Sequence, residues 1–105
     1  MDSYRVEVTQ RARQEARSLP GNMRQRVLRE LKALKHEPRP IKSQALDTKK
    51  SGISLSPGIE LYRIRLTPWR IIYAIEEEWE LVTVLAVRKR PPYEYDDLEE
   101  LIKDL

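Results

Sequence analysis

Three short runs of mostly β-branched and aromatic residues constrain the fold of this chain most strongly. The runs cover 59–66, 69–75 and 80–87, and they are too short and too rich in Ile, Val and Tyr to be helices. The breaks between them are short, Thr67-Pro68 and Glu76-Glu77-Glu78. Connections of this length join antiparallel neighbours, whereas parallel strands need a long crossover. The sequence therefore predicts consecutive antiparallel hairpins.

The residues before these runs predict one strand and two helices. Residues 4–8 alternate between apolar and polar side chains, which is typical of a half-buried strand. Thr9 can then cap a helix over 10–19, because its hydroxyl can accept from an amide of the first turn. Apolar residues recur at helical spacing after Asn22, which can cap a second helix. We expect two antiparallel helices joined by a tight turn.

The chain of 105 residues is expected to be one domain. Residues 37–58 show no period and are predicted to be a long loop, with a short turn around 44–46. Residues 96–105 can form a C-terminal helix. The order β-α-α-β-β-β-α predicts an α+β fold, in which two N-terminal helices pack on one face of a small antiparallel sheet.

The composition excludes several kinds of site. The chain has no cysteine and a single histidine, His36, so we expect no thiolate or zinc site and no histidine-based triad. No metal or other cofactor is expected. No stretch reaches the ~18 apolar residues of a membrane span, and the N-terminus shows no signal-peptide pattern. The cytoplasm is the expected compartment, with no membrane partner.

Charge is distributed unevenly along the chain. Residues 94–105 hold six carboxylates and one lysine, a net charge of −5, so residues 1–93 carry +8 of the total of +3. A basic body of this kind is typical of proteins that bind nucleic acids.

Strand alternation predicts an arginine-bearing face of the sheet. Arg63 and Arg65 alternate with apolar residues, and Arg70 alternates with the apolar set of the next run. In a tight hairpin Arg65 faces Arg70 and Arg63 faces Ile72, although Thr67-Pro68 does not suit common two-residue turns and leaves a wider turn open. Like charges directly opposite each other destabilise a sheet. Their presence suggests that an anion lies between them.

The last run continues into a second basic cluster. It ends in Arg88-Lys89-Arg90, and Tyr93 and Tyr95 follow closely. Guanidinium groups bind phosphate in a bidentate manner, and tyrosine rings stack on unpaired bases. Together these residues predict a groove for single-stranded RNA.

The order of these motifs resembles the RelE/ParE toxin superfamily. The resemblance is carried by the stretch 62–73 (YRIRLTPWRIIY), by the end of the last run at 87–90 (VRKR), and by a tyrosine a few residues later. It covers roughly residues 4–95 and implies a RelE-like fold.

By resemblance, the chain is a RelE-type toxin of a type II toxin–antitoxin system. The resemblance implies a ribosome-dependent endoribonuclease that cleaves mRNA and inhibits translation, with a cognate antitoxin that neutralises it in a toxin–antitoxin hetero-oligomer. The implied reaction is metal-independent attack of a ribose 2′-OH on the adjacent phosphate. It leaves a 2′,3′-cyclic phosphate and a 5′-OH.

The resemblance also assigns roles to the candidate residues. It implies that Arg70 and Arg90 clamp the scissile phosphate, and that Arg65 lies where RelE enzymes usually carry a lysine, as does Arg63. Tyr95, or else Tyr93, would stack on the substrate. The expected catalytic residues are Arg65, Arg70, Arg90 and Tyr95, and the expected RNA-binding residues are Arg63, Arg88, Lys89 and Tyr93. Guanidinium is effectively never deprotonated, so the general base is Tyr95, ribosomal RNA or no single group.

Two other functions remain open at this point. A ParE-like toxin on the same scaffold would inhibit DNA gyrase, and a non-catalytic RNA- or ribosome-binding module would hold phosphate without cleaving it. ParE-type members generally lack the full arginine–tyrosine set, so Arg65, Arg70 and Arg90 with a tyrosine favour the nuclease. We expect Arg70→Ala to lower cleavage by at least ~10²-fold, the scale of one transition-state donor. If Arg70 is exposed, stability should barely change.

Overall fold

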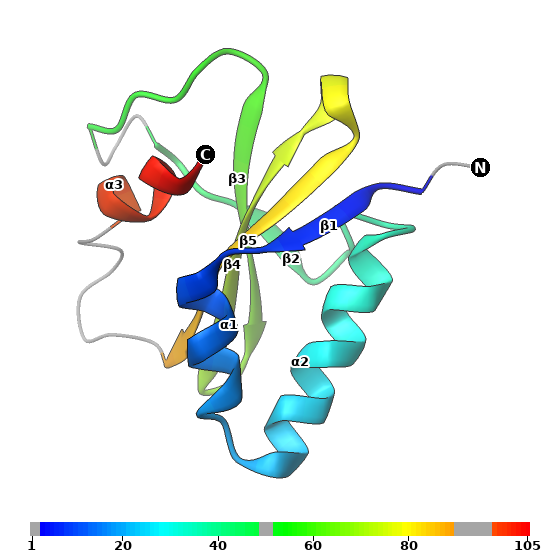
Figure 1. Cartoon of the computed structure of the whole chain (residues 1–105). Coiled ribbons are helices and arrows are strands. Elements are labelled where there is room, and N and C mark those ends of the chain that lie inside the picture. Colours follow the sequence, from blue (N-terminus) through cyan, green and yellow to red (C-terminus); the bar gives the residue numbers. More distant parts are fainter. Residues whose placement is uncertain (1–2, 49–51, 90–97) are drawn as a thin grey trace.

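A five-stranded sheet forms the middle layer of the fold, and helices lie against both of its faces (Figure 1). The computed structural model describes residues 3–48, 52–89 and 98–105. The elements in chain order are β1 (Arg5–Val8), α1 (Gln10–Arg17), α2 (Gly21–Leu34), β2 (Ser43–Ala45), β3 (Ile59–Leu66), β4 (Trp69–Glu76), the 3-10 helix η1 (Glu77–Trp79), β5 (Leu81–Lys89), α3 (Leu98–Leu101) and the 3-10 helix η2 (Ile102–Asp104).

The strand order across the sheet is β1-β5-β4-β3-β2. Strands β2 to β5 pair antiparallel, as the short breaks predict, and the α+β class is confirmed. The sheet is not purely antiparallel, however, because β1 pairs parallel with β5. Strand β1 thereby forms one edge of the sheet.

The segment 37–58 contains a short strand, where the sequence predicts only a loop. Strand β2 pairs with β3 through Ser43↔Ile64 and Ala45↔Tyr62. A strand of three residues with no apolar alternation gives almost no sequence signal, because its main-chain hydrogen bonds depend on the neighbouring strand. It forms at the edge of β3, 14 residues before β3 begins.

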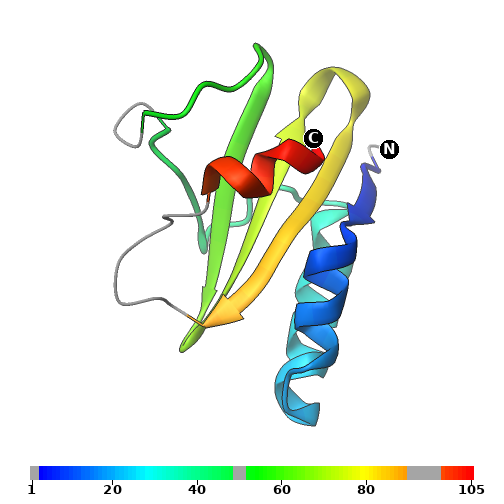
Figure 2. The same ribbon diagram turned by 60° about the vertical axis from the view of Figure 1, so that its left-hand side comes forward.

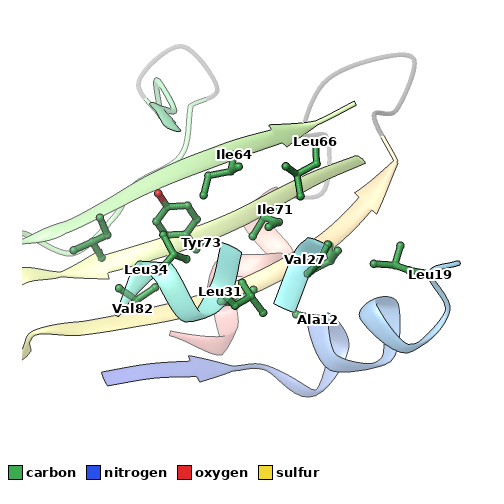
Figure 3. Close-up of a cluster of buried hydrophobic side chains, with 13 residues drawn as sticks. Ala12, Leu19, Val27, Leu31, Leu34, Ile64, Leu66, Ile71, Tyr73 and Val82 are labelled. Atoms are coloured by element: carbon green, nitrogen blue, oxygen red, sulfur yellow. The ribbon is translucent and has the colours of Figure 1, made fainter. Parts of the chain in front are cut away.

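The two N-terminal helices pack on one face of the sheet around the main core (Figure 3). Strand residues Ile64, Ile71 and Tyr73 meet Val27 and Leu34 of α2 in this cluster, and all are buried. Every second residue of β3 and β4 points toward the helices, as the alternation predicts. Burial of this stripe stabilises the helical layer, since the isolated helices are short.

The predicted N-terminal cap is observed for α1 but not for α2. The Thr9 hydroxyl accepts the Ala12 amide at 3.2 Å, so Thr9 is the predicted cap of α1. Asn22 is not the cap of α2, which begins one residue earlier at Gly21 with Pro20 in the capping position. Its side chain accepts only the adjacent Met23 amide, at 2.9 Å. Pro20 provides no side-chain hydrogen bond to the first turn of α2.

The C-terminal segment covers part of the opposite face of the sheet (Figure 2). Leu101 of α3 is buried in a second apolar cluster with Leu61, Ile72 and Ala86. A short helix therefore forms within the predicted range 96–105, of which residues 96 and 97 lie outside the described residues. None of the helices in the described parts of the chain combines the length and apolar character needed to cross a membrane.

Candidate functional site

The β3–β4 hairpin has the register that strand alternation predicts. Leu66 pairs with Trp69, Arg65 with Arg70 and Arg63 with Ile72. Only Thr67 and Pro68 separate the strands, and the peptide bond between them is cis. The wider turn left open by the sequence is therefore not used.

Strand β5 places a third arginine in line with this pair. Arg88 is the partner of Arg70, so Arg65, Arg70 and Arg88 lie side by side on β3, β4 and β5; we call these three residues the arginine row. Neighbouring Cα atoms in such a pairing are about 5 Å apart. The row crosses the sheet at the end where β5 finishes beside the β3–β4 turn (Figure 2).

A β-bulge in β5 determines that Arg88 joins the row. Tyr73 pairs with Val84 whereas Ile72 pairs with Ala86, so Leu85 is the extra residue. Without this shift Arg70 would pair with Val87, and Arg88 would point to the helical face, because one residue of slip reverses every side chain. The bulge therefore places the Arg88 side chain on the same face of the sheet as Arg70, directly beside it.

The three arginines differ in burial. Arg65 is exposed, the Arg88 side chain is 24% exposed, and Arg70 in the middle is only 2% exposed. The expectation that Arg70 could be replaced without affecting stability assumed an exposed side chain, and that assumption is wrong. Arg70 lies on the same face of β4 as the buried residues Ile72 and Ala74.

A carboxylate of α1 contacts the end of the row. Glu15 Oε1 accepts the Val87 amide at 2.8 Å, and Glu15 Oε2 accepts Arg88 Nη2 at 3.0 Å. Its side chain is 27% exposed. Sequence reasoning missed Glu15, since 73 residues separate it from Arg88 and no local pattern links the two.

The other predicted site residues have different positions. Arg63 lies on the same face as the row and donates to Gln44 Oε1 of β2. Lys89 lies on the opposite face, where its ammonium is 5.7 Å from the centre of the Trp69 ring, so it is not part of the row. Arg90, Tyr93 and Tyr95 lie outside the described residues.

A second polar cluster lies at the other end of β3 and β4. Arg39 donates to Glu60 at 2.6 Å, to Glu77 at 3.0 Å and to the Tyr62 hydroxyl at 3.2 Å, and Tyr4 donates to Glu77. The hydrogen bond from Tyr4, with that from Arg39, lowers the pKa of Glu77, and the same Tyr4–Glu77 contact raises the pKa of Tyr4. This cluster ties Arg39 to the sheet, far from the arginine row.

Tyr73 anchors the same segment from inside the core. Its hydroxyl donates to the Pro38 carbonyl at 2.7 Å, and its ring stacks on Tyr62 with the centroids 6.0 Å apart. Burial raises the pKa of Tyr73 to about 12. The tyrosine is therefore a neutral core residue, in agreement with its position on the apolar face.

The arginine row is suited to hold a phosphate group. Several guanidinium groups can donate to the non-bridging oxygens from different directions and keep their charge at any working pH. Within the described residues, His, Asp and Glu side chains form no group that could hold a metal ion. The guanidinium groups of the row can supply electrostatic stabilisation, and Glu15 is a carboxylate in contact with the row.

A separate apolar groove lies between β1 and α2. It has a volume of about 390 Å³, and its floor consists of Val6, Val8, Leu28 and Leu31. Its polar rim is cationic: Arg5, Lys32 and Lys35. Since β1 is an edge strand of the sheet, the groove borders main-chain groups that have no neighbouring strand.

Comparison with known proteins agrees with this fold. Residues 6–91 match the family described as the ParE toxin of the type II toxin–antitoxin system parDE. No curated protein sequence matches the chain.

Several solved toxin structures have the same architecture. The archaeal RelE–RelB complex from Pyrococcus horikoshii OT3 matches with a TM-score of 0.72 and 24% identity, over 87% of this chain and 99% of that one. The RelBE2 toxin–antitoxin complex from Mycobacterium tuberculosis matches with a TM-score of 0.64 and 25% identity, over 84% and 99%. The isolated E. coli RelE toxin matches with a TM-score of 0.59 and 20% identity, over 97% and 98%.

The family match spans most of the chain and includes β1 to β5. The chain therefore belongs to the RelE/ParE superfamily of type II toxin–antitoxin toxins.

Proposed function

We propose that this toxin is a metal-independent endoribonuclease that cleaves mRNA on the ribosome and so inhibits translation. The observation that carries the proposal is the arginine row, in which Arg65, Arg70 and Arg88 are paired across three neighbouring strands. Like charges directly opposite each other destabilise a sheet, so a bound anion would stabilise the arginine row. A phosphodiester of single-stranded RNA supplies such an anion, and the exposed Arg65 gives it access to the row.

The proposed chemistry needs little from the protein beyond position and charge. The 2′-OH attacks the adjacent phosphorus, the bond to the 5′ oxygen breaks, and the products end in a 2′,3′-cyclic phosphate and a 5′-OH. Arg70 and Arg88, together with Arg65, would stabilise the negative charge of the phosphorane. In the proposed site, Arg90 would also hold the scissile phosphate. Tyr95, or else Tyr93, would stack on the substrate. A general base is not assigned, because guanidinium groups do not deprotonate.

The test is to add the protein to translating ribosomes and to map the 5′ ends of the mRNA. We expect new 5′-OH ends in the presence of ribosomes and few without them. A non-catalytic binder would stall translation without new ends. A gyrase inhibitor, the alternative in keeping with a ParE-type family match, would block supercoiling and leave mRNA intact.

We further propose a cognate antitoxin as the partner of this toxin, in a hetero-oligomer. The Pyrococcus and Mycobacterium structures are both complexes with an antitoxin. In this chain the apolar groove between β1 and α2 suits an extended segment with apolar and acidic residues, because its rim carries Arg5, Lys32 and Lys35. Such a segment can also pair with the open edge of β1.

A further inference from the structure

The edge of β5 is covered by two different elements along its length. Strand β1 pairs with β5 only from Leu81 to Val84, whereas β5 continues to Lys89. Beyond Val84 the chain of β1 turns into α1, and a side chain of α1 replaces the strand: Glu15 accepts the Val87 amide at 2.8 Å. Beyond Val84 the outer edge of β5 is thus met by the Thr9 hydroxyl, which donates to the Leu85 carbonyl at 3.5 Å, and by the Glu15 carboxylate directly before Arg88.

We propose that Glu15 is a positioning residue, which fixes the direction of Arg88 within the arginine row and reduces the repulsion among the three guanidinium groups. The inference rests on the proposed function, because it assigns a role in the same site. Glu15 does not touch the reacting atoms. It acts through Arg88, whose Nη2 donates to Glu15 Oε2 at 3.0 Å.

The geometry makes this contact different from an ordinary surface ion pair. Both partners are about three-quarters buried, with 24% exposure for Arg88 and 27% for Glu15. Glu15 uses one oxygen for the main chain of β5 and the other for the guanidinium, so it fixes the strand and the side chain together. The long Arg88 side chain then loses rotamer freedom before substrate binds, which favours a rigid site.

The charge of Glu15 has a second consequence. It offsets one of the three positive charges of the row, so free RNA meets a weaker phosphate-binding surface than the arginines alone would make. Removing that charge should strengthen RNA binding and, at the same time, release Arg88. Opposite effects on binding and on turnover distinguish a positioning residue from a residue that only stabilises the fold.

The chain offers a matched control in Glu30. Glu30 also lies on a helix of the same layer and also forms an ion pair, with Lys42, but it is not in contact with the arginine row. Glu15→Gln and Glu30→Gln therefore change the net charge identically. Only the first should affect the site.

The experiment compares both variants with the complete wild-type protein on mRNA-programmed ribosomes. For Glu15→Gln we expect kcat to fall about 10-fold to 100-fold, the scale of a misplaced catalytic group, with an unchanged or lower KM. For Glu30→Gln we expect both constants to stay within about twofold, as for an ion pair remote from the chemistry. Equal kinetics for the two variants would overturn the inference.

A double-mutant cycle tests whether Glu15 acts through Arg88. Residues that act as a unit are not additive, so Glu15→Gln should cost little more in an Arg88→Ala background. Full additivity would contradict the proposal. If Glu15→Gln unfolds, Glu15→Asp replaces it: the charge stays but the shorter side chain cannot span both contacts, so kcat should fall while KM stays unchanged.

Two further readouts separate this inference from the proposed nuclease activity. Amide exchange at Val87 should accelerate in Glu15→Ala and not in Glu30→Ala; alanine is used because glutamine would keep an oxygen that can accept the Val87 amide. Binding of a short single-stranded RNA should show a steeper salt dependence for Glu15→Gln, by about 0.7 in the log–log slope for one additional phosphate contact. If the wild type cleaves nothing, the nuclease proposal fails; if these two readouts stay unchanged, the role of Glu15 fails.

Discussion

At the scale of single residues, Arg70 has two roles that can be separated. It is the centre of the arginine row, and it is also buried between the second apolar cluster and its charged neighbours. Truncation to alanine would mix the loss of a phosphate ligand with the loss of packing. Arg70→Met retains most of the side-chain volume and removes the charge.

We expect Arg70→Met to lower mRNA cleavage by about 10²-fold or more, the scale of one lost transition-state donor. Its free energy of unfolding should fall less than that of Arg70→Ala, because methionine keeps most of the buried side-chain volume that alanine loses. Cleavage assays and urea denaturation measure the two effects. A variant that is unstable yet cleaves normally when folded would show that Arg70 is structural.

Tyr73 gives a prediction about alkaline stability. Its hydroxyl bonds the buried Pro38 carbonyl, so Tyr73→Phe should cost about 1–3 kcal/mol at pH 7 by leaving that acceptor unsatisfied. Burial raises the pKa of Tyr73 to about 12 from an ordinary value near 10. A raised folded-state pKa favours the folded state below pH 10, and this contribution is lost as the pH rises through 12.

The stability difference between wild type and Tyr73→Phe should therefore be constant below about pH 10 and shrink above it. Urea denaturation from pH 8 to 12 measures the difference. A difference that stays constant up to pH 12 would mean that folding does not raise the pKa of Tyr73 above its unfolded value.

At the scale of elements, the sequence predicted what depends on local pattern. The hydrophobic periods gave both helices and the three long strands, and alternation gave the Arg65–Arg70 register. The short strand β2 and the parallel pairing of β1 depend on distant partners and left no pattern. The β-bulge at Leu85 also left no pattern in the sequence. It determines that Arg88 rather than Val87 pairs with Arg70.

The same limit applies to the candidate site. The arginines of the hairpin were predictable, because two residues of turn fix their pairing. Glu15 and the burial of Arg70 were not, since both depend on how α1 and the second apolar cluster pack against the sheet. Lys89 is adjacent to Arg88 in the sequence, but side chains alternate along β5, so Lys89 lies on the other face of the sheet.

The contacts of Glu77 with Arg39 and Tyr4 predict that the folded protein loses stability in acid. The pKa of Glu77 is lowered by the hydrogen bond from Tyr4 and by Arg39. A lowered carboxyl pKa stabilises the folded state above the unfolded pKa of about 4.5, and this contribution is lost as the pH falls through the folded value. Wild type should therefore lose stability more steeply than Glu77→Gln below about pH 4.5. Denaturation midpoints from pH 6 to 2.5 measure this, with the neighbouring Glu78→Gln as control.

At the scale of the whole molecule, the proposed phosphate site and the apolar groove lie on different parts of the fold. The arginine row is at the end of β3, β4 and β5, on the face that bears α3, whereas the groove lies between the edge strand β1 and α2. An antitoxin segment in the groove could hold the toxin without occupying the phosphate site. Binding of antitoxin and cleavage of RNA should then respond to different substitutions.

Leu28 tests this separation. It lines the groove and is 47% exposed, so Leu28→Ser should change the free energy of unfolding little. Losing its apolar contact with an antitoxin segment should weaken the complex about 10-fold, the equivalent of roughly 1.4 kcal/mol. Calorimetric titration with the cognate antitoxin measures the affinity, and ribosome-programmed cleavage should stay at the wild-type level.

Ile41→Ser is the matched control, because Ile41 is fully exposed and lies outside the groove. Its antitoxin affinity should equal that of the wild type. Conversely, Arg70→Met should bind the antitoxin normally while losing cleavage. If Leu28→Ser binds as tightly as Ile41→Ser, the antitoxin uses another surface, and the cationic rim of Arg5, Lys32 and Lys35 must be explained by a different polyanionic partner. If instead Arg70→Met loses antitoxin binding, the two surfaces are not independent, and the antitoxin neutralises the toxin by covering the arginine row itself.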